Sequence, residues 1–217
     1  MEIGVPLDVK SFIDQEIARP IRSQIVPLIQ QGYELVDSSL RDVSFLKWDM
    51  GRKHAGYLDN IAVQFMLYEA AKKGTLSNIT AEIVPNKKKS AYHVELKTAN
   101  VIITINRTKN KYVTSRKAIY RSILQKDNQY FWNFNHEEIQ EQPGYLELTH
   151  NQINRRVDFV NIGIPNGKGK WFSRIDLTKE LQLVGAPKEE EKNEITKEQL
   201  VRFKNFAQGV HENGGKN

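Results

Sequence analysis

Residues 92–107 read YHVELKTANVIITINR, and this stretch decides the fold of the chain. Apolar and polar side chains alternate on both sides of Ala99-Asn100, as in two strands joined by a two-residue turn. Such a turn pairs Leu96 with Ile103, and Val94 with Ile105 two positions further on, so that the apolar partners share one face. The stretch therefore predicts a β-hairpin whose opposite face is mainly polar and carries His93, Glu95, Lys97, Thr104 and Asn106.

The segments on either side of this hairpin give the fold class. Before it, apolar residues recur at helical spacing, with a stop signal at Gly32 and the strongest helix at residues 57–73. After it, a short basic helix is expected at 115–124, capped by Thr114 or Ser115. Alternating runs at 145–149, 157–164 and 171–177 then predict three more strands. The sequence thus predicts an α+β fold, in which N-terminal helices precede a mostly antiparallel sheet.

The chain divides into four parts of different composition. Residues 1–184 form one expected α+β domain, and residues 185–194 form an acidic linker. An amphipathic helix is expected at 195–210, because Thr196 and Gln199 have the spacing of a capping box. Residues 211–217 are rich in glycine and polar side chains, and they are expected to be a disordered tail.

The composition limits the cellular compartment and the kinds of chemistry that are expected of the protein. The 217 residues include no cysteine, which excludes disulfides and thiolate chemistry and fits a reducing cytoplasm. No apolar run approaches the ~20 residues that span a bilayer, so no membrane association is expected. The five histidines show no zinc-ligand spacing. The sequence therefore predicts a cytoplasmic protein, and it does not decide the oligomeric state.

Positive charge is concentrated in one segment. Residues 86–126 hold eleven basic side chains and one acid, a net charge of +10, whereas the whole chain carries +6. Such an excess predicts contact with a polyanion, either nucleic-acid backbone or an acidic protein partner. Tyrosines lie among the charges and could stack on bases. The alternative is an ordinary solvated surface. The candidate contact residues are Lys87, Lys88, Lys89, Arg107, Lys109, Lys111, Arg116, Lys117 and Arg121.

A second lysine-containing loop lies at residues 166–170, with the sequence NGKGK. The spacing of a nucleotide-binding phosphate loop is absent, and the residues connect two expected strands. We interpret this segment as a hairpin turn that could add a secondary basic contact.

Three residues suggest a possible catalytic centre. Glu82 lies on one expected strand, and Glu95 and Lys97 lie on the next. Two carboxylates near a lysine can hold a divalent metal and activate water for phosphodiester cleavage. The pattern resembles the motif of the PD-(D/E)XK nuclease superfamily, whose core continues as strand, helix and strand in a mixed sheet. That resemblance implies a Mg²⁺- or Mn²⁺-dependent nuclease. The alternative is a cross-strand ion pair on the hairpin face.

Three further stretches carry a family resemblance. They are residues 99–107 with 116–118, residues 146–150, and residues 157–171. Together they resemble small uncharacterised bacterial and phage proteins found in candidate toxin–antitoxin or phage-related loci. The resemblance implies a bacterial or phage protein. Three roles of the protein are possible: it binds a polyanion, it is a nuclease-type toxin, or it is a protein-binding module for an antitoxin or host target.

Overall fold

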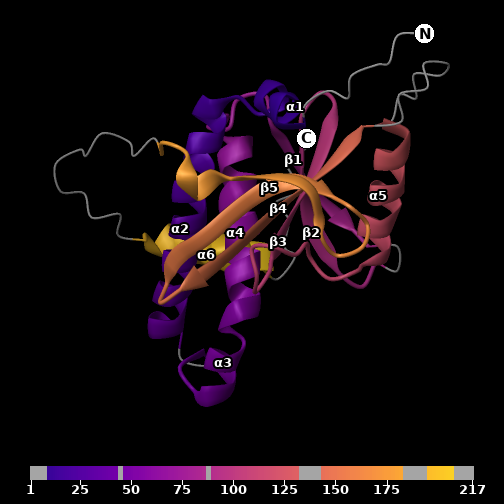
Figure 1. Cartoon of the computed structure of the whole chain (residues 1–217). Helices are drawn as coiled ribbons and strands as arrows, with labels where there is room; N and C mark the ends of the chain where they lie inside the picture. The colour runs from indigo at the N-terminus through magenta and orange to yellow at the C-terminus, as the bar shows by residue number, and fades with distance from the viewer. Residues whose placement is uncertain (1–8, 44–45, 87–88, 132–142, 183–194, 208–217) are drawn as a thin grey trace, which may run out of the picture.

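A single six-stranded sheet organises the protein. The computed structural model describes residues 9–43, 46–86, 89–131, 143–182 and 195–207 (Figure 1). The strands lie in chain order across the sheet, and all neighbours are antiparallel except β3 and β4, which run parallel. The predicted α+β class with a mostly antiparallel sheet is therefore confirmed. The strands are β1 (Thr80–Pro85), β2 (Tyr92–Lys97), β3 (Val101–Arg107), β4 (Gly144–Ile153), β5 (Arg156–Pro165) and β6 (Trp171–Asp176).

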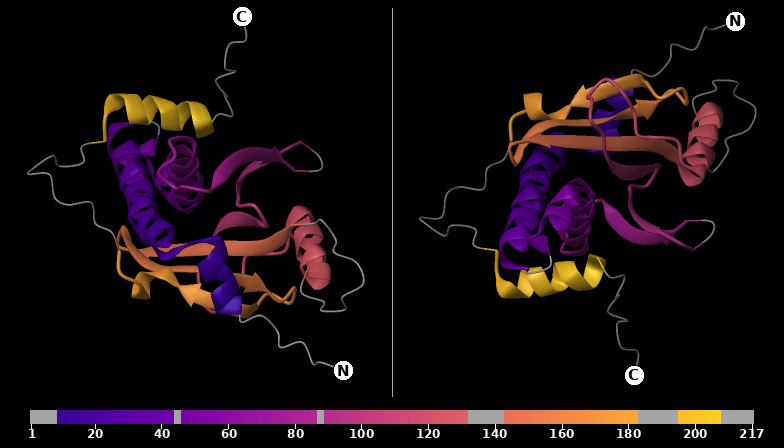
Figure 2. Two further views of the ribbon diagram at one scale, coloured as in Figure 1. Left: turned by 90° about the horizontal axis from the view of Figure 1, so that it is seen from above. Right: turned by 90° about the horizontal axis from the view of Figure 1, so that it is seen from below.

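Helices form the remaining layers. In both views of Figure 2, α2 and α4 lie between β4–β6 on one side and α6 on the other. The helix α5 connects β3 to β4, which makes their parallel pairing possible. The helices are α1 (Val9–Glu16), α2 (Arg19–Asp42), α3 (Asp49–Lys53), α4 (Ala55–Lys72), α5 (Ile119–Phe131) and α6 (Lys197–Ala207).

The β2–β3 hairpin has the register that the sequence predicts. Leu96 pairs with Ile103, and Glu95 pairs with Thr104. The apolar face of the hairpin is buried in the main core, together with Ile25 and Ile29 of α2. Alternation alone was sufficient here because a one-residue shift would exchange the two faces of each strand.

The predicted helix stop at Gly32 is wrong. The helix α2 runs through Gly32 and ends at Asp42. A Cβ atom at Gly32 would lie 3.1 Å from the backbone of Val63 in α4, so the glycine allows α2 and α4 to approach closely. The missing side chain serves helix–helix packing and does not end the helix.

The C-terminal helix begins with the predicted capping box. The backbone N–H of Gln199 donates to Thr196 Oγ1 at 3.2 Å, and the N–H of Thr196 donates to Gln199 Oε1 at 3.0 Å. The helix α6 then packs on α4, with Phe203 and Phe206 against Phe65. The linker at 185–194 and the tail at 211–217 lie outside the described residues. Within the described part of the chain, no helix has the length and apolar character needed to cross a membrane.

The predicted start of the basic helix needs correction. The helix α5 begins at Ile119, whereas residues 108–118 contain no helix and are here called the strap. Ser115 does not cap a helix, because both its backbone N–H and its hydroxyl donate to the carboxylate of Glu147 on β4. A long-range partner has replaced the local cap.

Candidate functional site

The strap lies across the polar side of the sheet and is held there by hydrogen bonds. The carbonyl of Lys111 accepts from Asn161 Nδ2 at 3.0 Å and from Trp171 Nε1 at 3.3 Å. The N–H of Thr114 donates to the carbonyl of Gly169, and Val113 forms a bridge with Lys170. The strap and the 166–170 loop, distant in sequence, are therefore neighbours in space.

This arrangement gathers cations from two segments onto one surface, here called the strap surface. Neither segment contains an aspartate or glutamate. Within the described part of the chain, none of the six cations forms an ion pair with a carboxylate. The strap surface consists of Lys109, Lys111, Tyr112, Arg116, Lys117, Lys168 and Lys170.

Tyr112 stands among these cations with 63% of its surface exposed. The ammonium of Lys111 and the guanidinium of Arg174 each lie 5.5 Å from the centre of its ring. Both contacts have cation–π geometry, and they position the ring without covering it. An exposed, positioned aromatic ring beside unpaired cations can stack on a base while the cations contact phosphates.

Two of the predicted contact residues have structural partners instead. Arg107 lies 3.6 Å from the buried carboxylate of Asp59 and donates to Asn151. Arg121 donates to Asn106 Oδ1 at 2.8 Å and also to the carbonyl of Arg116. Because their guanidinium groups are already bound within the protein, these arginines are less available to a ligand than the strap cations.

The remaining predicted contacts lie in the β1–β2 loop. Lys89 is exposed there, with a left-handed backbone at φ 53°. Lys87 and Lys88 lie outside the described residues. The structure thus divides the predicted contact residues among the strap, the β1–β2 loop and two arginines bound internally.

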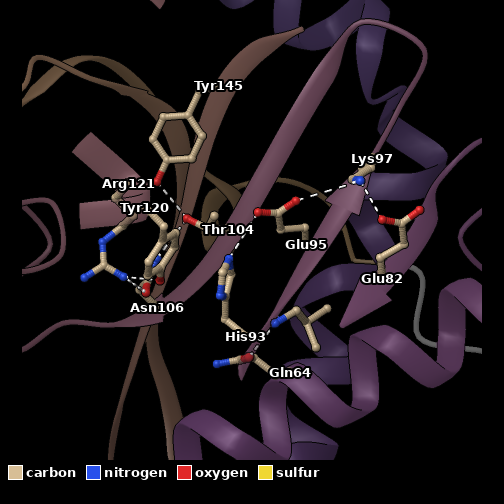
Figure 3. A network of polar contacts seen from close by, with 11 residues as sticks. Gln64, Glu82, His93, Glu95, Lys97, Thr104, Asn106, Tyr120, Arg121 and Tyr145 are labelled. Atoms are coloured by element: carbon tan, nitrogen blue, oxygen red, sulfur yellow. Dashed lines mark hydrogen bonds and ion pairs between the residues drawn. The ribbon is translucent and has the colours of Figure 1, made fainter. Parts of the chain in front are cut away.

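The predicted catalytic trio does come together in space. Glu82 and Glu95 face each other across β1 and β2. Lys97 Nζ lies 2.6 Å from Glu82 and 3.9 Å from Glu95, while His93 Nε2 lies 3.1 Å from the other oxygen of Glu95 (Figure 3). Lys97 lowers the pKa of Glu82 through a hydrogen bond and its charge. The described residues contain no group of three or more carboxylates and histidines spaced to hold a metal.

The polar face of the hairpin belongs to a larger buried network. Glu147 is fully buried and accepts from Ser115 and from Asn106 Nδ2. Burial raises the pKa of Glu147, although the hydrogen bonds from Ser115 oppose the rise. Thr104 contacts the hydroxyl of Tyr145 at 2.7 Å (Figure 3). This network anchors the strap to the sheet.

The ring of Tyr120 connects this network to the predicted trio. It stacks on His93 with 3.9 Å between ring centres, and the guanidinium of Arg121 lies 4.8 Å from the Tyr120 ring centre. The sequence did not identify Glu147 as a site residue, and it singled out Tyr120 only as one of the tyrosines that could stack on bases. The alternation at 145–149 did place Glu147 on the strand face opposite to Leu146 and Leu148, and this was the one available signal.

Comparison of the chain with family models, curated proteins and solved structures finds no match.

Proposed function

We propose that the protein binds nucleic-acid backbone through the strap surface. One observation carries the proposal: two segments without acidic residues meet, and together they hold six cations and an exposed tyrosine. Cations that form no ion pair with a carboxylate among the described residues can neutralise phosphates and release counterions. Because phosphate contacts carry no sequence information, binding is expected to depend weakly on sequence.

The exposed ring of Tyr112 favours a single strand over a duplex. In a duplex the bases are stacked on each other, whereas an unpaired base can stack on an aromatic ring. Stacking of this kind contributes about 1–3 kcal/mol per base. The strap surface combines both contributions, and hydrogen bonds to the sheet hold the backbone of the strap in place before a ligand arrives.

Fluorescence anisotropy with labelled single-stranded DNA, single-stranded RNA and duplex DNA at low salt tests this proposal. The variant Lys168→Glu with Lys170→Glu is expected to weaken binding of every sequence. The control Lys197→Glu with Lys204→Glu changes the net charge equally on exposed positions of α6, across the molecule from the strap surface (Figure 2). Equal losses in both double variants would show that overall charge, and not this surface, is responsible.

Tyr112 provides an independent arm of the same experiment. Tyr112→Ala should weaken single-strand binding more than duplex binding, whereas Tyr112→Phe keeps the ring and should retain affinity. If no nucleic acid binds at low salt, the proposal is wrong. Recovery of one specific acidic protein in a pull-down would then favour the protein-binding alternative.

A second candidate function is metal-dependent phosphodiester cleavage, as in a nuclease-type toxin. The observation in its favour is that Glu82 and Glu95 both approach Lys97 on neighbouring strands. Incubation of plasmid and RNA with Mg²⁺ or Mn²⁺ tests it. Cleavage that disappears in Glu95→Gln supports the assignment, and cleavage that survives this change removes Glu95 from the mechanism.

A further inference from the structure

A cavity of about 320 Å³ lies where α4, the β1–β2 hairpin and the end of α6 meet. One stripe of α4 lines it, with Tyr57, Ile61 and Gln64 at successive helical turns. Tyr92 of β2 and Phe206 of α6 contribute aromatic side chains from the other elements. The volume falls at the lower end of the range for small-molecule sites, about 300–1,000 Å³.

Two side-chain amides in the wall are fixed in orientation. Asn60 Oδ1 accepts the backbone N–H of Arg107 at 2.8 Å, and Gln64 Oε1 accepts that of Val94 at 2.9 Å. Because a backbone N–H requires an acceptor, each amide oxygen must face its strand. Each NH₂ group is therefore directed away from that bond, and both residues line the cavity. Each amide keeps an NH₂ donor that its bond to the strand does not use, and such donors suit a ligand with hydrogen-bond acceptors.

The composition of the lining selects the kind of ligand. None of the described lining residues is a lysine, arginine, aspartate or glutamate, so a neutral group fits the cavity. Tyr57 is 70% exposed and offers a flat aromatic surface for stacking. Lys89 is exposed and directly precedes the lining residue Ser90, which places a cation beside the cavity. A flat neutral ring with acceptor atoms and an anionic tail matches these features.

We propose that this cavity is a nucleotide site that binds a nucleobase against Tyr57 and beside the Asn60 and Gln64 amides. The base belongs either to a free nucleotide or to an unpaired position of a bound strand. The site shares no residue with the strap surface, so it can exist whether or not that surface binds nucleic acid.

Titration calorimetry with the four common nucleoside monophosphates tests the site directly. Saturable binding with a dissociation constant below about 1 mM is expected for at least one of them. Tyr57→Ala and Ala91→Trp should each weaken it by about tenfold, by removing a stacking surface and by filling the cavity. Tyr57→Phe and the remote control Phe172→Ala, which removes an exposed aromatic ring from β6, should stay within about twofold of the wild type.

Anisotropy with a single-stranded oligonucleotide identifies the source of the base. If the base comes from a bound strand, Tyr57→Ala weakens strand binding without changing its salt dependence. If the ligand is a free nucleotide, Tyr57→Ala affects only the mononucleotide. Because Tyr57 is exposed, a thermal melt should show that Tyr57→Ala remains folded.

Two results would overturn the site: no saturable binding of any of the four nucleotides, or binding that neither Tyr57→Ala nor Ala91→Trp changes. Failure of the strap surface is distinguishable. In that case the Lys168→Glu, Lys170→Glu variant binds strands as the wild type does, while mononucleotide binding still depends on Tyr57.

Discussion

The two faces of the sheet bury different chemistry by different means. One face packs its aliphatic side chains against α2 and α4, as in most soluble domains. The other face buries Glu147, Asn106, Thr104 and Asn161 beneath the strap and the start of α5. The first face is stabilised by apolar area removed from water. The second is stabilised by hydrogen bonds among its buried polar groups, although Thr149 Oγ1 has no partner within the described residues.

This difference shows which charges are available for function. Arg107 and Arg121 reach inward from the basic segment and bind acceptors within the protein. The cations of the strap surface have no carboxylate partner within the described residues. Net charge along the sequence cannot separate these two groups, because both are simply basic residues in one segment.

The largest expected effect comes from breaking the apolar face. Leu148→Ala on β4 removes a fully buried side chain and should lower the free energy of unfolding by about 2–5 kcal/mol. Leu181→Ala is the matched control, because Leu181 is 94% exposed and its loss should change stability by less than about 0.5 kcal/mol. Urea denaturation measures both. Equal effects would contradict the assignment of the core.

A pH titration of stability examines the contact between α2 and the sheet. His150 is buried against the hydroxyl of Tyr33 at 2.7 Å, and burial lowers its pKa to about 3. In the unfolded chain the pKa of a histidine is near 6.5. Between about pH 3 and pH 6.5, the unfolded chain therefore binds a proton at His150 that the folded chain does not bind. Stability should fall as pH decreases through this window, by about 1.4 kcal/mol per pH unit once below pH 6.

The His150→Gln variant isolates this contribution. The burial-raised pKa values of Glu147 and Asp59 act in the opposite direction, but they are present in both proteins. The difference in unfolding free energy between wild type and variant should therefore change between pH 7 and pH 5. A difference independent of pH would show that His150 takes up its proton equally in the folded and unfolded chains, and it would contradict the lowering of its pKa by burial.

Disrupting the polar face should lower the free energy of unfolding by a somewhat smaller amount. Glu147→Ala leaves Ser115 and Asn106 without their shared acceptor, at a cost of about 1–3 kcal/mol. Hydrogen exchange at the Ser115 amide should become faster, because the strap loses its anchor. Glu147→Gln retains one acceptor oxygen and should have a smaller effect. Unchanged exchange in Glu147→Ala would show that the strap is held elsewhere.

The smallest effect on binding is expected from an arginine that the network already holds. Arg121→Gln should lower stability by about 1 kcal/mol, because Asn106 loses a donor. It should leave the slope of log affinity against log salt unchanged. A reduced slope, measured by anisotropy across salt concentrations, would place Arg121 in the ligand contact after all.

Local patterns in the sequence predicted the hairpin register, the strand positions and the capping box of α6, because these depend on neighbouring residues. The patterns missed features that depend on distant partners. Gly32 was predicted to end a helix, but it allows α2 to pack closely against Val63 of α4. Ser115 was predicted as a helix cap, but it donates to Glu147 instead. The meeting of the strap with the 166–170 loop has no local signal at all.

The salt dependence of single-strand binding tests the central claim most directly. The claim is that the cations of the strap surface, and not the internally bound arginines, contact phosphates. Each lost phosphate contact should make the slope shallower by about 0.7 for a single strand. The Lys168→Glu, Lys170→Glu variant should therefore show a clearly shallower slope than both the wild type and the Lys197→Glu, Lys204→Glu control. Identical slopes for all three proteins would contradict the account.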